Sequence, residues 1–512
     1  MSHHGFILRA CYQLDAGQRE RYVFAAKVRR VLVTTNQETT FVPHYSSLVS
    51  ELQKIVFDHD LIERYDEKGP RYTTYPSTDC FKEQFTALDY EHILCQQAPG
   101  TLIKPLSLYF HLPFCNSICY YCACNKVITK DHKQADVYLD YLIREINLQA
   151  NQLPHRAKVS QLHLGGGTPT FFSDIQLKQL MEAIRTRFDL LPGGDFSIEI
   201  DPRSASTATI SLLRELGFKH MSVSILDLDP AVQLAVNRIQ SAEETCRVIE
   251  CARVCGFDSI NIDLIYGLPK QTTTSLQATI DLVLQLRPDR LALYDYDHQP
   301  ERFMPQRQIH QDDLPTTSVK LELLGNSIKQ LTDAGYVFIG MSHFALPDDE
   351  LTIAQRRGRL HQDVQGYSTH SDCDLMAFGV SAISRVGPTY CQNTKLLDDY
   401  YAIVDSGQLP VDCGIRLNRD DLLRRSIIQS LLCQFELSFQ PLEIGYFIDF
   451  KSYFSDELVA LAKMAADGLL LIEDDRIFVL PPGRLLVRTI AMTFDRYWRT
   501  QNSTDTNYAR LT

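Results

Sequence analysis

Short apolar stretches alternate with helical patterns through the middle of the chain. The stretches that read as strands cover residues 106–112, 160–164, 196–200, 221–226, 259–266 and 290–296. Between the second and the third, apolar residues recur at helical spacing after a capping box of Ser173 and Gln176, which predicts a helix over 173–188. Six strand–helix units of this kind predict an α/β fold, an incomplete parallel (β/α)6 barrel.

Polar or glycine-rich segments follow these strands, where parallel barrels collect their chemistry. In strand order they are a cysteine-rich loop, the glycine run at 165–170, Glu199 with Asp201 and Arg203, Asn237 with Arg238, and Asp263 with Ile265. Each segment alone could be a surface charge or a simple strand-to-helix turn. Their shared position favours one cavity, and several carboxylates facing it predict a cationic or hydroxyl-rich ligand.

The cysteine-rich loop has the sequence YFHLPFCNSICYYCACN at 109–125. It carries Cys115, Cys119, Cys122 and Cys124, which are too close together for unstrained disulfides. The spacing C-x3-C-x2-C suits three sulfurs on three irons of one [4Fe-4S] cluster, with the fourth iron open to a small molecule. Zinc is the alternative, but structural zinc sites draw ligand pairs from separate turns, and no second CxxC or HxxxH follows. The spacing favours the iron–sulfur cluster.

Composition limits the other functions. A chain of 512 residues with 45% hydrophobic content can form two or three units, and it contains no apolar run near 18 residues that would span a membrane. Fourteen cysteines without a secretory h-region in residues 1–50 indicate a reducing, cytoplasmic compartment. The net charge of −12 argues against nucleic acid as the main partner.

The two ends of the chain are predicted to be separate from the barrel at 105–393. Residues 1–57 read as an extension of unknown role, and 58–104 as a substrate-covering segment that contains GPRYTTYP. Arg71 beside Tyr72 and Tyr75 suits an anionic planar ligand, although a loop packed by its tyrosines explains them equally well.

Residues 394–512 are predicted to form a small, mostly helical, winged-helix-like domain. A helix begins after an Asn418 cap, and a strand, a turn at Asp474-Asp475, a second strand and a helix follow. The acidic chain disfavours the DNA-binding role of winged helices, although the arginines of this domain keep it open; they are Arg424, Arg425, Arg484 and Arg488. We therefore expect a packing and substrate-covering domain.

The cysteine loop followed by GGGTP resembles the radical S-adenosylmethionine (SAM) superfamily. Further motifs narrow the resemblance to the oxygen-independent coproporphyrinogen III dehydrogenases (HemN-type) of haem biosynthesis; they are GPRYTTYP, IEIDPR, VNRIQ, NIDLIYGLPKQT, HFALPDDEL, QGYSTHSDCDL and GVSAIS. The match runs from about residue 58 to about residue 500. The related haem-chaperone branch usually has an aromatic residue at the position of Cys124 and lacks GPRYTTYP.

The resemblance implies a mechanism and its residues. The cysteines Cys115, Cys119 and Cys122 would hold a [4Fe-4S] cluster that reduces SAM, and the resulting deoxyadenosyl radical would take a hydrogen from a substrate propionate. Loss of carbon dioxide and an electron would then leave a vinyl group, twice per substrate. The residues implied to contact the first SAM are Tyr109, Gly166, Glu199 and Ile383, and those implied for a second SAM are Tyr121 (usually Phe), Gly167, Thr168, Arg238 and Asp263.

Arg71 would meet a propionate of the macrocycle, and this implication favours the ligand interpretation of GPRYTTYP. The resemblance further implies coproporphyrinogen III as substrate, an unidentified reductant and electron acceptor, a monomer and no nucleic-acid partner.

Four positions depart from the family pattern. Ser224 and Leu226 replace a Gly-x-Gln whose glutamine is expected to hydrogen-bond the second SAM. Asp297 replaces a small residue, and Ser342 replaces the aspartate of the family's M-D-H-F. A lost hydrogen-bond partner costs about 0.5–3 kcal/mol. The alternative is therefore a divergent paralogue that binds cluster or haem without turnover. A radical enzyme that modifies nucleic acid is disfavoured because the chain lacks an added basic domain.

Overall fold

The computed structural model describes residues 54–96, 104–370 and 373–500. They form two compact units. The larger unit comprises Thr73–Tyr336 and Ser342–Leu422, and the smaller comprises 54–72, Val337–Met341 and 423–500. The expectations for residues 1–53 lie outside the described residues. No helix in the described ranges is both long and apolar enough to cross a membrane.

A mostly parallel sheet forms the centre of the larger unit. Its six consecutive parallel strands are β1 (Leu106–Leu112), β4 (Lys158–Gly166), β5 (Asp189–Ile200), β6 (His220–Leu226), β7 (Ser259–Tyr266) and β8 (Arg290–Asp295). β13 (Asp374–Phe378) pairs in parallel with the outer side of β1, and β10 (His343–Ala345) pairs antiparallel with β8. Because other strands flank β1 and β8, these two do not pair with each other. The predicted incomplete (β/α)6 barrel is confirmed.

Antiparallel strands extend the sheet beyond β13. They are β14 (Ile383–Val386), β15 (Thr389–Asn393) and β16 (Val411–Arg416). Two short pairs complete the strands of this unit: β2 (Phe114–Cys115) with β3 (Val127–Ile128), and β11 (His361–Asp363) with β12 (Gly366–Ser368).

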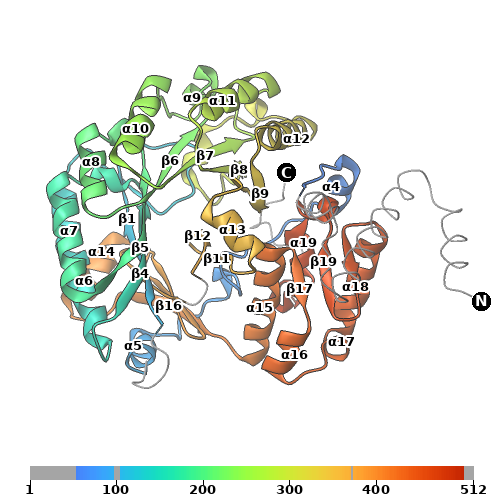
Figure 1. Cartoon of the computed structure of the whole chain (residues 1–512). Coiled ribbons are helices and arrows are strands. Elements are labelled where there is room, and N and C mark those ends of the chain that lie inside the picture. Colours follow the sequence, from blue (N-terminus) through green and yellow to red (C-terminus); the bar gives the residue numbers. More distant parts are fainter. Residues whose placement is uncertain (1–53, 97–103, 371–372, 501–512) are drawn as a thin grey trace, which may run out of the picture. The chain divides into compact units, whose positions relative to one another are not determined.

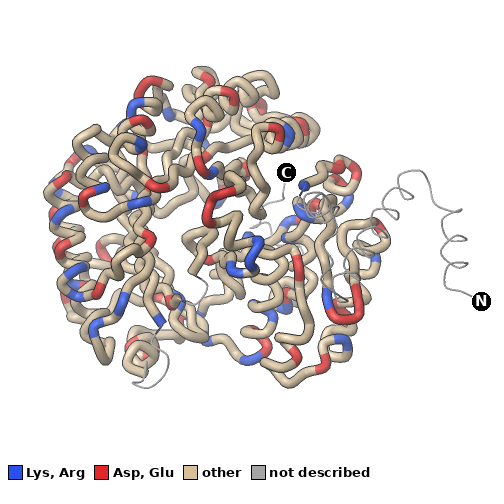
Figure 2. Tube along the Cα trace, viewed as in Figure 1, with Lys and Arg blue, Asp and Glu red and all other residues tan. Residues whose placement is uncertain are grey.

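Helices cover the outer face of the sheet, and Figure 1 shows α6, α7, α8 and α10 on that face. The helices of the larger unit are α5 (Ala87–Cys95), α6 (Lys133–Gln152), α7 (Asp174–Arg187), α8 (Thr207–Glu215), α9 (Pro230–Ala235), α10 (Ala242–Cys255), α11 (Thr273–Gln285), α12 (Thr317–Asp333), α13 (Glu350–Arg356) and α14 (Leu397–Asp405). Short 3-10 helices are η2 (Thr78–Cys80), η3 (Pro169–Phe171), η4 (Pro202–Ser204), η5 (Met304–Gln308) and η6 (Gln311–Asp313). Figure 2 shows charges of both signs interspersed over these helices.

The local sequence explains both kinds of element. β1 is buried along nearly its whole length because helices cover one face and the barrel interior the other, so its apolar run is continuous. The predicted helix forms as α7, where Ser173 caps the first turn and Gln176 completes the capping box. Its buried side chains are those at the predicted helical spacing, together with the capping residue Gln176.

The smaller unit contains a three-stranded antiparallel sheet and short helices. The strands are β17 (Glu436–Ser438), β18 (Leu470–Ile472) and β19 (Arg476–Val479), with β19 in the middle, and β9 (Val337–Gly340) also belongs to this unit. The helices are α4 (His59–Tyr65), α16 (Gln440–Tyr446), α17 (Phe450–Tyr453), α18 (Ser455–Ala466), α19 (Val487–Met492) and α20 (Arg496–Thr500), with the 3-10 helix η7 (Pro481–Gly483). α15 (Arg419–Gln434) belongs to it from residue 423 onward.

Three of the four arginines that left a DNA-binding role possible make contacts within the smaller unit. Arg424 donates to Glu457 Oε1 at 3.0 Å, and Arg488 donates to the backbone oxygen of Glu67 at 3.2 Å. Arg484 lies over the Phe435 ring at 4.6 Å, and burial lowers the pKa of its guanidinium to about 10. These three cations stabilise the unit itself, which supports the packing interpretation.

Candidate active site

The cysteine loop follows the C-terminal end of β1, and hydrogen bonds join its beginning to its end. Cys115 ends β2, which pairs with β3, and the Val127 amide donates to the Pro113 oxygen at 2.8 Å. Inside the loop, Lys126 Nζ donates to the backbone oxygens of Cys122 and Cys124, at 3.2 Å each. These bonds bring sequence-adjacent cysteines into one compact turn.

The thiols of this loop lie in different electrostatic surroundings. Burial raises the pKa of Cys115 to about 11, and neighbouring Cys122 and Cys119 act in the same direction. A hydrogen bond from Cys124, supported by the Lys126 ammonium, lowers the pKa of Cys122 to about 6. The charges of both other predicted ligands therefore act on the Cys115 thiol.

Cys119 faces two guanidinium groups. Its Sγ lies 3.9 Å from Arg203 Nη2 and 3.8 Å from Arg238 Nη1, and both arginines contact the Asp201 carboxylate, at 2.7 and 3.2 Å. Arg238 also donates to Gln240 Oε1, while its buried Nε has no hydrogen-bond partner among the described residues. The two guanidinium groups place positive charge beside this sulfur, where it would balance the negative charge of a metal-bound thiolate.

The glycine run after β4 touches this loop through its backbone. The Gly167 amide donates to the Leu112 oxygen at 2.9 Å, and Cys115 Sγ lies 3.4 Å from Thr168 Oγ1. A Cβ at Gly167 would lie 2.4 Å from the Pro113 oxygen, and Gly166 has a φ of +117°. Only glycine fits such close contact and such a backbone conformation.

Glu199 lies next to the glycine run at the end of β5. Its Oε2 accepts the Gly166 amide at 3.1 Å, and its Oε1 lies 3.4 Å from His163 Nε2. The side chain remains 41% exposed, so it is available to a ligand. The Tyr109 ring stacks on the His163 ring at 5.7 Å with an interplanar angle of 12°.

His163 is a residue of this site that the sequence analysis missed. Its Nδ1 contacts Ser197 Oγ at 2.6 Å and its other nitrogen faces Glu199, so it orients this carboxylate. The available signal was its position in β4, two residues before the glycine run. A single histidine in an apolar strand carries no spacing that distinguishes it from a core residue.

Asp263 is the buried carboxylate of the site. It accepts from Ser222 Oγ at 2.9 Å and from Asn261 Nδ2 at 2.8 Å. Burial raises its pKa to about 6, and the charge of Glu199 acts in the same direction. The charge of Glu199 thus acts on Asp263, although the two carboxylates come from β5 and β7 with β6 between them.

The remaining predicted residues lie at several places. Tyr121 accepts from Gln306 through its backbone oxygen at 3.3 Å, and Ile383 is the half-buried first residue of β14. Arg71 is exposed and belongs to the smaller unit. Tyr72 and Tyr75 are each only 2% exposed, as a loop packed by its tyrosines requires.

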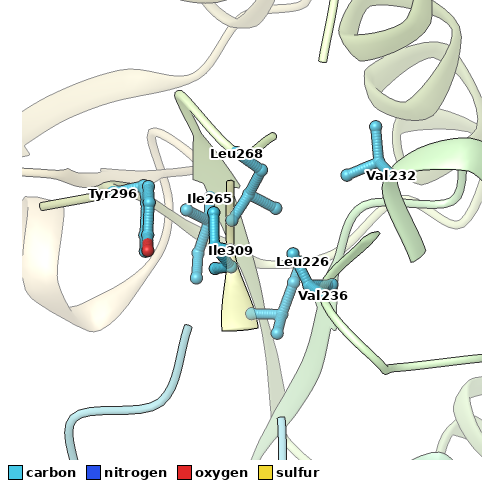
Figure 3. Close-up of a cluster of buried hydrophobic side chains, with 7 residues drawn as sticks. All are labelled: Leu226, Val232, Val236, Ile265, Leu268, Tyr296 and Ile309. Carbon is cyan, nitrogen blue, oxygen red and sulfur yellow. The ribbon is translucent and has the colours of Figure 1, made fainter. Parts of the chain in front are cut away.

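Leu226 belongs to an apolar cluster at the ends of β6 and β7 (Figure 3). The buried members are Leu226, Val232, Val236, Ile265, Leu268, Tyr296 and Ile309, with Tyr120 and Tyr121 of the cysteine loop packed against them. Leu226 has a φ of +72°, beside a register shift between β6 and β7. The Ser224 oxygen accepts from Arg238 Nη2 at 2.7 Å, and Asp297 accepts from Gln299. The site is thus apolar at Leu226, where the family pattern has a glutamine side chain.

Comparisons with known proteins agree with this geometry. The model of the radical SAM superfamily matches residues 109–283. The chain is 51% identical to the oxygen-independent coproporphyrinogen III oxidase of Pseudomonas aeruginosa, covering 87% of this chain and 97% of the relative. It is 45% identical to the enzyme of the same name from Escherichia coli, covering 88% and 97%.

A solved structure agrees as well. The solved structure of coproporphyrinogen III oxidase (HemN) from Escherichia coli, described as a radical SAM enzyme, superposes with a TM-score of 0.82 at 43% identity over 87% of this chain and 100% of that one. The family resemblance inferred from the motifs is confirmed. The chain belongs to the oxygen-independent coproporphyrinogen III oxidase (dehydrogenase) family of the radical SAM superfamily.

Proposed function

We propose that this chain oxidatively decarboxylates coproporphyrinogen III to protoporphyrinogen IX in haem biosynthesis, without oxygen. Relatives at 41–51% identity carry this enzyme's name, which favours turnover over the alternative of binding alone. The observation that carries the proposal is the cysteine loop beside the glycine run and Glu199. In this arrangement, three thiols that could bind a cluster lie beside the glycine run and the Glu199 carboxylate, which could bind the ligand of the open iron.

A [4Fe-4S] cluster and SAM are the cofactors, and the residues present fit them. Cys115, Cys119 and Cys122 would hold the cluster, with Arg203 and Arg238 balancing its negative charge. The glycine run lets the backbone pack closely against the cysteine loop and Glu199, and Glu199 would attract the amino group or the sulfonium of SAM. When bound, the two cofactors supply the radical that takes a hydrogen from the substrate.

The chain's own residues would orient these groups. The first SAM would contact Tyr109, Gly166, Glu199 and Ile383, and a second would contact Tyr121, Gly167, Thr168, Arg238 and Asp263. His163 would hold Glu199 in place through its contact at 3.4 Å. Because Leu226 offers no hydrogen bond, the second molecule would rely on the charges of Asp263 and Arg238.

The substrate needs cations and a dry site. Coproporphyrinogen III carries four propionates, and the exposed guanidinium of Arg71 would pair with one of them in a forked geometry. We assign residues 58–104 and the domain at 394–512 to covering the substrate, because a radical must be kept from water. We also propose a cytoplasmic monomer that uses a separate reductant and electron acceptor, with no nucleic-acid partner.

The test is an anaerobic reaction of the cluster-loaded protein with coproporphyrinogen III, SAM and dithionite, with an electron acceptor present. We expect protoporphyrinogen IX, with two methionines released per product because two propionates react. Product and methionine are measured by chromatography and mass spectrometry. A protein that holds four irons and four sulfides but forms no product would instead favour the binding role.

Asp263 predicts a pH dependence of SAM binding. Its pKa is raised to about 6, so the carboxylate is charged above this pH and takes a proton below it. Attraction of a sulfonium is therefore lost as the pH falls through 6, and affinity for the second SAM should fall up to about tenfold per pH unit between 6 and 5. Anaerobic equilibrium dialysis with labelled SAM between pH 5 and 8 measures this.

Two variants test whether Asp263 causes this pH dependence. Asp263→Asn should bind the second SAM weakly at every pH, whereas the exposed Asp140→Asn should behave as wild type. A second-site affinity that does not change between pH 5 and 8 in the wild type would contradict the assignment.

A further inference from the structure

A second group of metal-ligating side chains lies at the N-terminal end of the barrel. Asp195 of β5, His220 at the start of β6 and Glu350 at the start of α13 form this group, which we name the floor cluster. One potential ligand atom from each lies within 4.8 Å of the others. The cysteine loop follows the opposite, C-terminal ends of the strands, so the floor cluster is separate from the proposed cofactor site.

The spacing within the floor cluster suits a shared cation. Asp195 Oδ1 lies 3.6 Å from His220 Nε2, which is longer than a good hydrogen bond. Two ligands on a tetrahedral metal with bonds of 2.0–2.1 Å are about 3.3–3.5 Å apart. His220 also has a buried Nδ1 without a hydrogen-bond partner among the described residues. This imidazole is therefore placed beside a carboxylate and makes no good hydrogen bond of its own.

The second carboxylate oxygen of Asp195 contacts another histidine. His370 Nε2 lies 2.6 Å from Asp195 Oδ2 and fixes the orientation of the carboxylate. Carboxylates that bind metals commonly have such outer partners, because the partner directs the free oxygen toward the ion. Asp195 thus has one oxygen anchored and one directed at His220.

A cavity adjoins these side chains. Its volume is about 80 Å³, and all three residues of the floor cluster line it. Arg290 also lines it, and so does His163, whose ring contacts Glu199 of the proposed cofactor site. A water molecule takes up about 30 Å³, so the cavity has room for a cation and a water. The cavity is an observation independent of the side-chain distances, and it supplies the open coordination position.

The charge around the cavity also suits a divalent cation. Arg290 is already paired with Asp349, with Nε 2.8 and 3.0 Å from the two carboxylate oxygens, and its Nη2 is 4.0 Å from Glu350. The Glu350 side chain is 60% exposed, so it can turn toward the cavity without disturbing the core. Two carboxylates and one neutral imidazole would neutralise the ion.

We propose that the floor cluster binds one divalent transition-metal ion, Mn²⁺ or Zn²⁺, through Asp195, His220 and Glu350. Carboxylate ligands suit Mn²⁺ and imidazole suits Zn²⁺, so the mixed set accommodates both. The bound ion joins α13 to β5 and β6, and its role is to stabilise this end of the barrel.

Mn²⁺ is the probe for the test because it avoids the thiols, which prefer softer metals. The full-length, cluster-loaded protein is titrated anaerobically with MnCl₂, and free Mn²⁺ is followed by its electron paramagnetic resonance signal. We expect one Mn²⁺ per chain, displaced by Zn²⁺, and a higher melting temperature with the ion bound.

Variants separate the site from general surface binding. Glu350→Gln changes an exposed residue, and it should weaken Mn²⁺ binding at least tenfold and remove the melting shift. His370→Gln should weaken it about 10–100-fold through Asp195. Glu182→Gln, an exposed glutamate on α7, should bind as wild type. Equal binding in Glu350→Gln and Glu182→Gln, or no stoichiometric binding by the wild type, would overturn the proposal.

Discussion

Replacing Cys119 by serine is expected to abolish both the cluster and the decarboxylation. Cys119 is the buried thiol that faces Arg203 and Arg238 at 3.9 and 3.8 Å, and serine cannot supply a thiolate between them. Since the cofactors carry the chemistry, we expect activity to fall by more than about 10⁴-fold. Iron and sulfide counts after anaerobic reconstitution, together with the product assay, measure this effect.

Cys124→Ser is the matched control for this loss. Cys124 lies two residues after Cys122 in the same loop but is exposed, and the proposal gives it no iron. This variant should keep four irons per chain and most of the activity. If it lost the cluster while Cys119→Ser kept it, the assignment of the three ligands would be wrong.

Replacing Gly167 by alanine is expected to have the second-largest effect. The added Cβ would lie 2.4 Å from the oxygen and 2.6 Å from the carbon of Pro113, which are backbone atoms that cannot rotate away. The segment leading into the cysteine loop must therefore shift. Because a misplacement of about 1 Å in a catalytic arrangement costs about 100-fold in rate, we expect a loss of at least that size.

The expected defect is one of positioning, so the fold should survive. Circular dichroism of Gly167→Ala should match the wild type, and the affinity for SAM should fall together with the rate. Gly445→Ala is the control, because a Cβ there meets no atom within 4 Å and the residue lies in the helix α16. Wild-type activity in Gly167→Ala would show that the glycine run does not position the cysteine loop.

Much of the barrel could be predicted from local patterns. The strand predicted at 106–112 forms as β1 and that at 259–266 as β7, because buried parallel strands are continuous apolar runs. The helix predicted over 173–188 forms within one residue of its expected ends, because its cap is encoded by Ser173 and Gln176. The cysteine loop was predictable for a similar reason, since all its thiols lie within ten residues.

Contacts between distant segments could not be predicted in this way. His163 meets Glu199 across two strands, and Arg203 meets Arg238 through Asp201. The positive φ of Leu226 depends on a register shift against β7. The floor cluster joins residues that are up to 155 positions apart in the sequence, from Asp195 to Glu350, and nothing in its local motifs indicates a ligand.

The sequence by itself determined the strand and helix pattern, the thiol spacing and the glycines that the site requires, because each depends on neighbours within a few residues. The tertiary structure alone decided which carboxylate pairs with which cation and which arginines make contacts within the smaller unit. It also decided where the apolar cluster around Leu226 lies, at the position where the family pattern has a glutamine. These features depend on burial and on distances between side chains from different strands. Such distances exist only after the sheet has assembled.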